Sequence, residues 1–316
     1  CGGEFRFEKK VTDLKIENGI IKKVITGEGD VVEANSVILA TGHSARDIFS
    51  MLTEKKIAIE FKPFALGVRV EHPQSLIDSV QYHCLIRDEF LPPSSYSLVQ
   101  QVDGKGVFSF CMCPGGIIAP AATNPDELVV NGWSPSKRNN PFANSGIVVA
   151  VEEKDILHHR KYGQLSGMYF QQDVEQKAFK AGGGKFVAPA QRLPDFCENR
   201  VSSSLPACSY LPGINSASLG DVLPPFINER LRTAFKEFSK KMRGYYTNDA
   251  VVVATESRTS SPVRIPRSGE TLRHPQVSNL YPCGEGGGYA GGIVSAAMDG
   301  EKVALAVAQY ELAGDF

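Results

Sequence analysis

The stretch Gly284–Ile293 reads GEGGGYAGGI and decides the fold of this chain. It holds six glycines in its first nine positions, between a predicted strand over 277–283 and a predicted helix over 291–313. Backbone amides without side chains can approach a planar ligand, and the positive end of a helix dipole favours an electron-rich ligand edge. We interpret the stretch as a ligand-binding loop. The alternative is a tight strand-to-helix turn before a well-packed helix.

Within this stretch, Gly286, Gly288 and Gly291 form a literal G-x-G-x-x-G pattern. A Rossmann fingerprint also needs a helix, a second strand and an acidic residue about 20 positions on. The residues after Gly291 instead predict a single helix, and Glu311 lies on that helix although its distance fits. We therefore do not assign a dinucleotide fingerprint here.

A second informative stretch is Val37–Gly42, which reads VILATG. A continuously apolar run such as 37–40 is typical of a strand buried on both faces of a parallel sheet. Ligands of open α/β sheets lie beyond the carboxyl ends of the strands. Thr41 and Gly42 therefore either flank a ligand or form a simple glycine turn.

The rest of the chain shows two different residue patterns, one before and one after residue 63. Residues 4–34 alternate apolar and polar positions around the turn pair Asn18-Gly19, which predicts a small antiparallel meander with its first strand over 5–11. From residue 63 the pattern predicts short strands and long turns. The expected strands are 64–70, 97–101, 107–112, 128–131, 147–151 and 251–254. The expected helices are 44–52, 164–181 and 222–242, the last with Asp221 as its N-cap.

Composition excludes several classes of protein. The 316 residues suggest about two domains, and 42% hydrophobic and 22% charged residues are ordinary for a globular chain. A net charge of −1 gives no electrostatic reason to bind nucleic acid or acidic membranes. Seven cysteines without a C-x-x-C motif indicate thiols in a reducing cytoplasm, and we expect no metal site. A small-molecule substrate is the expected partner, with no nucleic acid and no membrane.

Several motifs carry a family resemblance. The runs 37–42 and 281–286 resemble the A-T-G strand and the terminal Gly–acidic strand end of two-dinucleotide-binding-domain flavoproteins. More closely, four segments resemble the uncharacterised bacterial FAD-dependent dehydrogenases, a relative of the HI0933-like flavoproteins. These segments are 110–116 (FCMCPGG), Asn144-Ser145, 256–264 (ESRTSSPVR) and 284–300.

The resemblance implies an α/β fold with mixed α+β character. Residues 1–61 and 275–316 would form the remainder of an FAD-binding domain, and 62–274 an inserted, mainly β substrate domain. The family's N-terminal strand, fingerprint and helix have no match here. The resemblance therefore implies the C-terminal portion of an FAD-dependent oxidoreductase, with weak FAD binding by this chain alone. The reaction would be hydride transfer between a small substrate and flavin N5.

The resemblance also implies roles for individual residues toward FAD. Thr41 and Gly42 would lie beside the dinucleotide, and Glu285 would accept a hydrogen bond from a ribityl hydroxyl. The amides of Gly292 and Ile293 would face the pyrimidine edge of the flavin. The other cofactor-binding residues of the same loop are Gly284 and Gly291.

The segment after the predicted strand 251–254 contains Arg258, Arg264 and Arg267 together with three hydroxyl residues. Arginine recognises carboxylate or phosphate groups with two parallel hydrogen bonds. We interpret Arg258 and Arg264 as a site for an anionic substrate group, the alternative being a solvated loop. A second function follows from the same residues, namely a flavin-free module that binds an anionic ligand. A nicotinamide-dependent reductase is disfavoured because no second fingerprint is present.

Three further residues are candidates for catalysis. Cys111 and Cys113 alternate on a predicted strand, so both thiols could share one face as a redox pair or pocket lining. The alternative, which we favour, is two small buried hydrophobes, because no basic neighbour in sequence would lower a thiol pKa. His43 follows Thr41-Gly42 and is a general acid or base by position, although a lone histidine more often makes a structural hydrogen bond.

Overall fold

The computed structural model describes residues 2–313, which form two compact units with a mixed α/β fold. Unit 1 comprises residues 1–63, 156–168 and 260–316, and unit 2 comprises 64–155 and 169–259. This division differs from the predicted boundaries at 62–63, 156–168 and 260–274, which all lie in unit 1. The last of these segments belongs there because β15 (Val263–Arg264) pairs with β5 (Glu60–Phe61).

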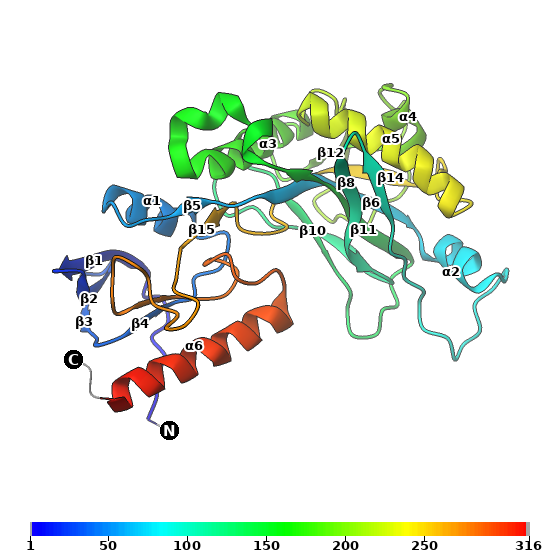
Figure 1. Ribbon diagram of the computed structural model, residues 1–316. Coiled ribbons are helices and arrows are strands. Elements are labelled where there is room, and N and C mark those ends of the chain that lie inside the picture. Colours follow the sequence, from blue (N-terminus) through cyan, green and yellow to red (C-terminus); the bar gives the residue numbers. More distant parts are fainter. Residues whose placement is uncertain (1, 314–316) are drawn as a thin grey trace. The chain divides into compact units, whose positions relative to one another are not determined.

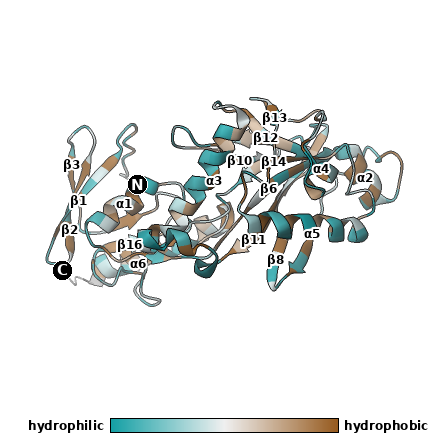
Figure 2. Ribbon diagram, turned by 90° about the horizontal axis from the view of Figure 1, so that it is seen from above, coloured by the Kyte–Doolittle hydropathy of each residue, from teal (hydrophilic) through white to brown (hydrophobic). Residues whose placement is uncertain are grey.

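An antiparallel meander forms the first part of unit 1, as predicted. Asn18 and Gly19 both have positive φ, at 52° and 75°, as a two-residue hairpin requires. The predicted first strand over 5–11 is wrong, because pairing with the second strand starts only at Val11. The strands carry both hydrophilic and hydrophobic residues (Figure 2). Their bounds are β1 Val11–Glu17, β2 Ile20–Thr26 and β3 Val31–Glu33.

Two parallel strands, β4 (Val37–Leu39) and β16 (Leu280–Pro282), join the distant ends of unit 1. Helix α6 (Ile293–Ala313) packs beside β16 through Val303 (Figure 2). The expected burial of β4 on both faces is wrong, since Ile38 is 41% exposed. The described residues do not cover the face of this two-stranded sheet on which Ile38 lies. The remaining elements of unit 1 are α1 Arg46–Glu54 and the 3-10 helix η2 Leu157–Leu165.

A large mixed sheet forms unit 2, and Figure 1 labels its strands β6, β8, β11, β12 and β14. The strand order is β13-β12-β14-β6-β11-β8-β7. All neighbours are antiparallel except β12 and β13. A separate pair, β9 with β10, completes the strands of the unit. The bounds are β6 Phe64–Pro73, β7 Val99–Val102, β8 Lys105–Cys113, β9 Ile117–Pro120, β10 Val130–Trp133, β11 Phe142–Val151, β12 Ala188–Arg192, β13 Ile214–Ser216 and β14 Val251–Glu256.

Helix α5 (Pro225–Lys241) packs on this sheet through apolar residues at helical spacing, including Leu231 and Phe235. The predicted N-cap Asp221 is wrong, because Pro224 occupies that position without a side-chain cap. Pro225 fits the first helical position because its missing N–H would have no partner there. The other helices are α2 Gln74–Tyr82, α3 Ser166–Gly182, which begins in unit 1, α4 Leu193–Cys197 and the 3-10 turn η1 Glu153–Asp155.

Candidate functional site

The loops after β4 and β16 meet at the same edge of their parallel pair. A Cβ built on Gly286 would lie 2.5 Å from the carbonyl oxygen of Gly42. Such an approach excludes any side chain at position 286. Gly42 itself has a φ of +76°, a left-handed conformation that glycine adopts readily. The structure therefore brings together two of the predicted cofactor segments, 41–42 and 284–286.

A polar contact joins the same two loops. The Nδ1 atom of His43 lies 2.8 Å from Oε2 of Glu285, and about a quarter of each side chain is exposed. His43 is therefore a hydrogen-bonding partner of Glu285. The sequence predicted both residues near the ligand but did not predict the contact between them. Thr41, two residues before His43, is exposed.

Arg267 and Asp299 anchor the glycine loop through a hydrogen bond and an ion pair. Asp299 accepts a 2.8 Å hydrogen bond from the Gly284 amide and forms a 2.6 Å ion pair with Arg267. Burial opposes ionisation of Asp299, but Arg267 and the Gly284 amide outweigh it and lower the carboxyl pKa. The guanidinium of Arg267 also lies 3.7 Å from the ring centroid of Tyr289. Arg267 thus supports the loop.

The start of α6 is open. A Cβ on Gly291 or Gly292 would meet no heavy atom within 4 Å, and Ile293 is 91% exposed. Within residues 2–313, no hydrogen bond is formed by the amides of Gly292 and Ile293. Helix N-termini leave such donors unsatisfied, and they favour negative charge. This end of α6 has the donors and the space to receive an electron-rich ligand edge.

Two cations flank the other end of the loop. A Cβ on Gly288 would lie 3.1 Å from the Cα of Arg264 and 3.1 Å from the Cδ of Lys62. Burial lowers the pKa of Lys62, and the positive charge of Arg264 lowers it further. Neither residue forms an ion pair with a carboxylate in the described part of the chain. The arrangement is suited to bind an anionic group.

Arg258 lies in unit 2 and has a different environment. Its side chain is 5% exposed and forms 2.9 Å ion pairs with both Glu127 and Glu175. Thr123 Oγ1 accepts from the remaining guanidinium nitrogen. The predicted pairing of Arg258 with Arg264 around one anion is therefore not supported, because two protein carboxylates already neutralise Arg258. A buried guanidinium requires such compensation.

The exposure of Cys111 differs from the preferred prediction of two buried thiols. Cys111 has a φ of +50° and is exposed, whereas Cys113 is buried and its thiol donates to the Cys111 carbonyl oxygen at 3.2 Å. When Cys111 ionises, the Cys113 thiol can donate to its sulfur instead. This hydrogen bond and the charge of Arg69 lower the pKa of Cys111, against the effect of burial. Our preferred interpretation of two buried hydrophobes is thus wrong for Cys111. The basic neighbour, Arg69, lies on another strand.

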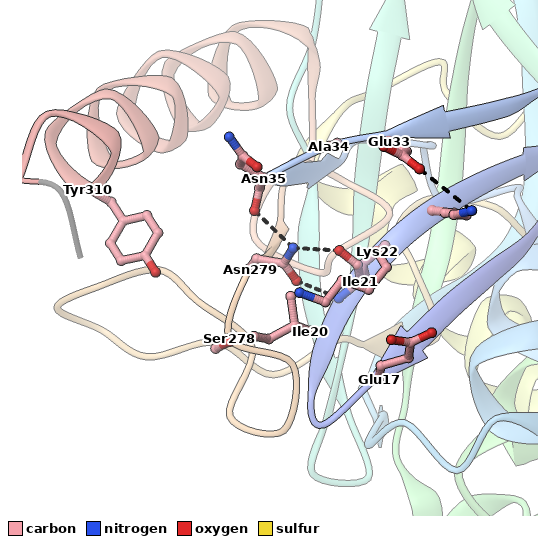
Figure 3. Close-up of a pocket in the computed structure, with 11 residues that line it drawn as sticks. Glu17, Ile20, Ile21, Lys22, Glu33, Ala34, Asn35, Ser278, Asn279 and Tyr310 are labelled. Atoms are coloured by element: carbon pink, nitrogen blue, oxygen red, sulfur yellow. Dashed lines mark hydrogen bonds and ion pairs between the residues drawn. The ribbon is translucent and has the colours of Figure 1, made fainter. Parts of the chain in front are cut away.

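A pocket of about 470 Å³ in unit 1 lies along the β1–β2 hairpin and does not include the glycine loop. Asn279 spans one side of it, accepting from the Ile21 amide at 2.8 Å and donating to the carbonyls of Ile21 and Asn35 at 2.9 Å (Figure 3). These bonds fasten the meander to the segment before β16. We assign this pocket a structural origin.

No group of three or more His, Cys, Asp or Glu side chains in 2–313 is placed to hold a metal ion. No described helix combines the length and apolarity needed to cross a bilayer.

Comparison with known proteins gives one family and one relative. A family model described as "FAD-dependent protein, C-terminal domain-like" matches residues 63–259. A Clostridium beijerinckii protein named "Uncharacterized protein" is 40% identical over 307 residues. The alignment covers 96% of this chain but 57% of the relative, so the chain spans little more than half the relative's length.

Among solved structures, the crystal structure of tetracycline destructase Tet(51) covers 51% of this chain and 33% of its own chain. Its sequence identity is 14% and its TM-score is 0.22. A TM-score this low carries no argument about fold or function.

Proposed function

We propose that this chain, which belongs to the family described as "FAD-dependent protein, C-terminal domain-like", is part of an FAD-dependent oxidoreductase. Unit 1 of the chain would hold the flavin end of FAD. The observation that carries the proposal is the approach of Gly286 to Gly42 beside the open N-terminus of α6. It supports the cofactor roles that the sequence suggested for both loops. The greater length of the C. beijerinckii relative leaves room for a further part that would bind the ADP half.

The residues present fit a flavin edge. Gly291 and Gly292 leave open space where any larger residue would project a side chain, and the amides of Gly292 and Ile293 have no partner within the described residues. Preorganised amide donors stabilise negative charge that develops during a reaction. These two amides would therefore stabilise the electron-rich edge of the bound cofactor.

Bound FAD would supply the hydride acceptor or donor, at its N5 atom. The chain would supply position and electrostatics. Glu285 uses Oε2 toward His43, so its other carboxylate oxygen would accept a hydrogen bond from a ribityl hydroxyl. Contact with Glu285 fixes the His43 ring, which would hold a proton beside the cofactor.

Lys62 and Arg264 would bind an anionic group of the substrate. Both residues lie next to Gly288 and neither forms an ion pair in the described part of the chain. Burial lowers the pKa of Lys62, and the positive charge of Arg264 lowers it further. This assignment replaces Arg258 with Lys62 as the partner of Arg264. The flavin-free alternative relies on these same cations and differs in its requirement for FAD.

The flavin content of the complete gene product tests the proposal. We expect a yellow protein that retains about one FAD per chain through gel filtration. The 316-residue chain, tested alongside it, is expected to bind FAD weakly. A complete product that is colourless and gains no flavin on incubation with FAD would contradict the proposal and favour an anion-binding module.

A further inference from the structure

We propose that Cys111 and Cys113 form a redox-active dithiol in unit 2 that undergoes thiol–disulfide exchange with low-molecular-weight disulfides. The inference does not depend on FAD, because every residue that carries it lies in unit 2. It rests on the backbone around the two cysteines, on the charge next to them and on unsatisfied polar groups buried beside them.

A bulge in β8 leaves Cys111 exposed and Cys113 buried. Cys113 pairs with Asn144 of β11 and Phe110 pairs with Gly146, so two residues of β8 face Ser145 alone. Cys111 occupies this bulge with a φ of +50°, a conformation that non-glycine residues rarely adopt. Its thiol is exposed while that of Cys113 is buried. An accessible attacking sulfur therefore has a shielded second sulfur as its neighbour.

Arg69 supplies positive charge to the pair. Its side chain is fully buried, and Nη2 donates to the Cys111 carbonyl oxygen at 2.6 Å. Its Nε lies 3.2 Å from Glu256 Oε2, but the two atoms are not aligned for a hydrogen bond. Burial raises the pKa of Glu256 to about 7. Near neutral pH the carboxylate therefore only partly offsets Arg69, which favours a Cys111 thiolate.

Unsatisfied polar groups lie on the same face as Cys113. Asn144 is directly opposite Cys113 in the antiparallel pair, so the two side chains share one face. Asn144 is completely buried, and neither atom of its amide forms a hydrogen bond within the described residues. Buried amides are nearly always satisfied, so this exception calls for a ligand or reacting group. A polar molecule entering beside Cys111 would provide the missing partners.

The charged and titratable groups around Cys111 come from three elements and one loop. Arg69 belongs to β6, Glu256 to β14 and Cys113 to β8, while Tyr96 precedes β7. Burial raises the pKa of Tyr96, so its hydroxyl stays protonated. Strand β11 contributes only the uncharged Asn144 and Ser145. Arg69 is thus the one permanent charge among these groups.

The exchange balances without a further reactant. The Cys111 thiolate attacks one sulfur of a disulfide RSSR, forming a Cys111–SR bond and releasing RS⁻. The Cys113 sulfur then attacks Cys111 Sγ, forming the Cys111–Cys113 bond and releasing the second RS⁻, which leaves with the Cys113 proton as RSH. The protein dithiol is oxidised by two electrons, and the small disulfide is reduced to two thiols.

Glutathione disulfide is the probe for the test. After incubation, free thiols are blocked with N-ethylmaleimide and tryptic peptides are weighed. Residues 106–137 form one peptide that contains both cysteines, and residues 70–87 form another that contains the partly exposed control Cys84. We expect peptide 106–137 to lose two hydrogens and to take up no blocking reagent, while Cys84 remains blocked. Equal glutathione adducts on Cys84 and Cys111, with Cys113 still reduced, would overturn the proposal.

Two variants separate the roles of the second thiol. Both Cys113→Ser and Cys113→Ala are expected to trap Cys111 as a stable glutathione adduct. Only serine retains a hydrogen-bond donor at position 113. The pH dependence of Cys111 alkylation by iodoacetamide is therefore expected to keep its midpoint near pH 6 in Cys113→Ser. In Cys113→Ala the midpoint is expected to shift upward. Identical midpoints would contradict the geometry. Circular dichroism verifies folding, and the wild-type mass measurement stands if either variant fails to fold.

Discussion

The Nδ1 atom of His43 lies 2.8 Å from Oε2 of Glu285, although 242 residues separate them in sequence. This contact forms because β4 and β16 run parallel and end at one edge. It joins two segments that local sequence patterns marked independently as ligand-facing. The contact thereby links the fold of unit 1 to its proposed function.

Replacing Gly286 by alanine is expected to destabilise unit 1. The added Cβ would lie 2.5 Å from the Gly42 carbonyl oxygen, which is rigid backbone, and overpacking of this kind costs about 1–3 kcal/mol. Hydrogen exchange of amides in β4 and β16 measures the effect. The matched control is Gly291→Ala, where the Cβ meets no neighbour within 4 Å. Equal protection in the two variants would mean that the loops do not touch.

Arg258 and Arg264 are expected to respond oppositely to substitution. Arg258→Gln removes the guanidinium that forms ion pairs with the buried Glu127 and Glu175, which is expected to cost about 3–5 kcal/mol. The only tryptophan, Trp133, lies in β10 of unit 2, so its fluorescence during urea unfolding reports this loss. Arg264→Gln is expected to change stability by less than about 0.5 kcal/mol while abolishing protection by small anions. Stability loss in Arg264→Gln with protection retained would indicate a structural role for Arg264.

Acid is expected to weaken unit 2 through His72. Burial lowers the pKa of His72 from 6.5 to about 4, despite its hydrogen bond to the Tyr245 carbonyl. The unfolded chain therefore binds the proton more tightly, and stability falls as the pH drops from 6.5 to 4, by on the order of 3 kcal/mol. Glu256 acts in the opposite direction, because its raised pKa removes stability as the pH rises from 4.5 to about 7.

Comparison of wild type with His72→Gln isolates the histidine contribution. The difference in their free energies of unfolding, followed by Trp133 fluorescence at several pH values, is expected to shrink between pH 6.5 and 4. A difference that does not vary with pH would contradict burial of a neutral His72.

Local patterns predicted much of the fold. The Asn18-Gly19 hairpin, six of the strands of unit 2 and the glycine loop before α6 each arise from residues adjacent in sequence, whereas β9, β12 and β13 were not predicted. The sequence also predicted the two segments that contain β4 and β16 as strands, but not their parallel pairing. By contrast, residues 5–10 alternate like a strand but join no described sheet, because the neighbouring strand β2 ends at Thr26.

The charge partners could not be predicted, because they depend on long-range contacts. Arg258 is neutralised by residues 131 and 83 positions away, and Arg69 reaches the Cys111 carbonyl from 42 positions away. A single sequence gives no signal for such pairs. The C-x-C spacing is visible in the sequence, but the exposure of Cys111 and its neighbour Arg69 are not.

The most direct test of the central claim measures FAD affinity in Gly292→Val and Gly300→Val variants of the complete gene product. Gly292 directly precedes α6 and Gly300 lies within it, and a Cβ at either meets no heavy atom within 4 Å in the described chain. Only Gly292 faces the proposed flavin edge, so we expect Gly292→Val to lose FAD affinity at least tenfold while Gly300→Val retains it. Equal FAD affinity in two folded variants would contradict the assignment of the flavin to this loop.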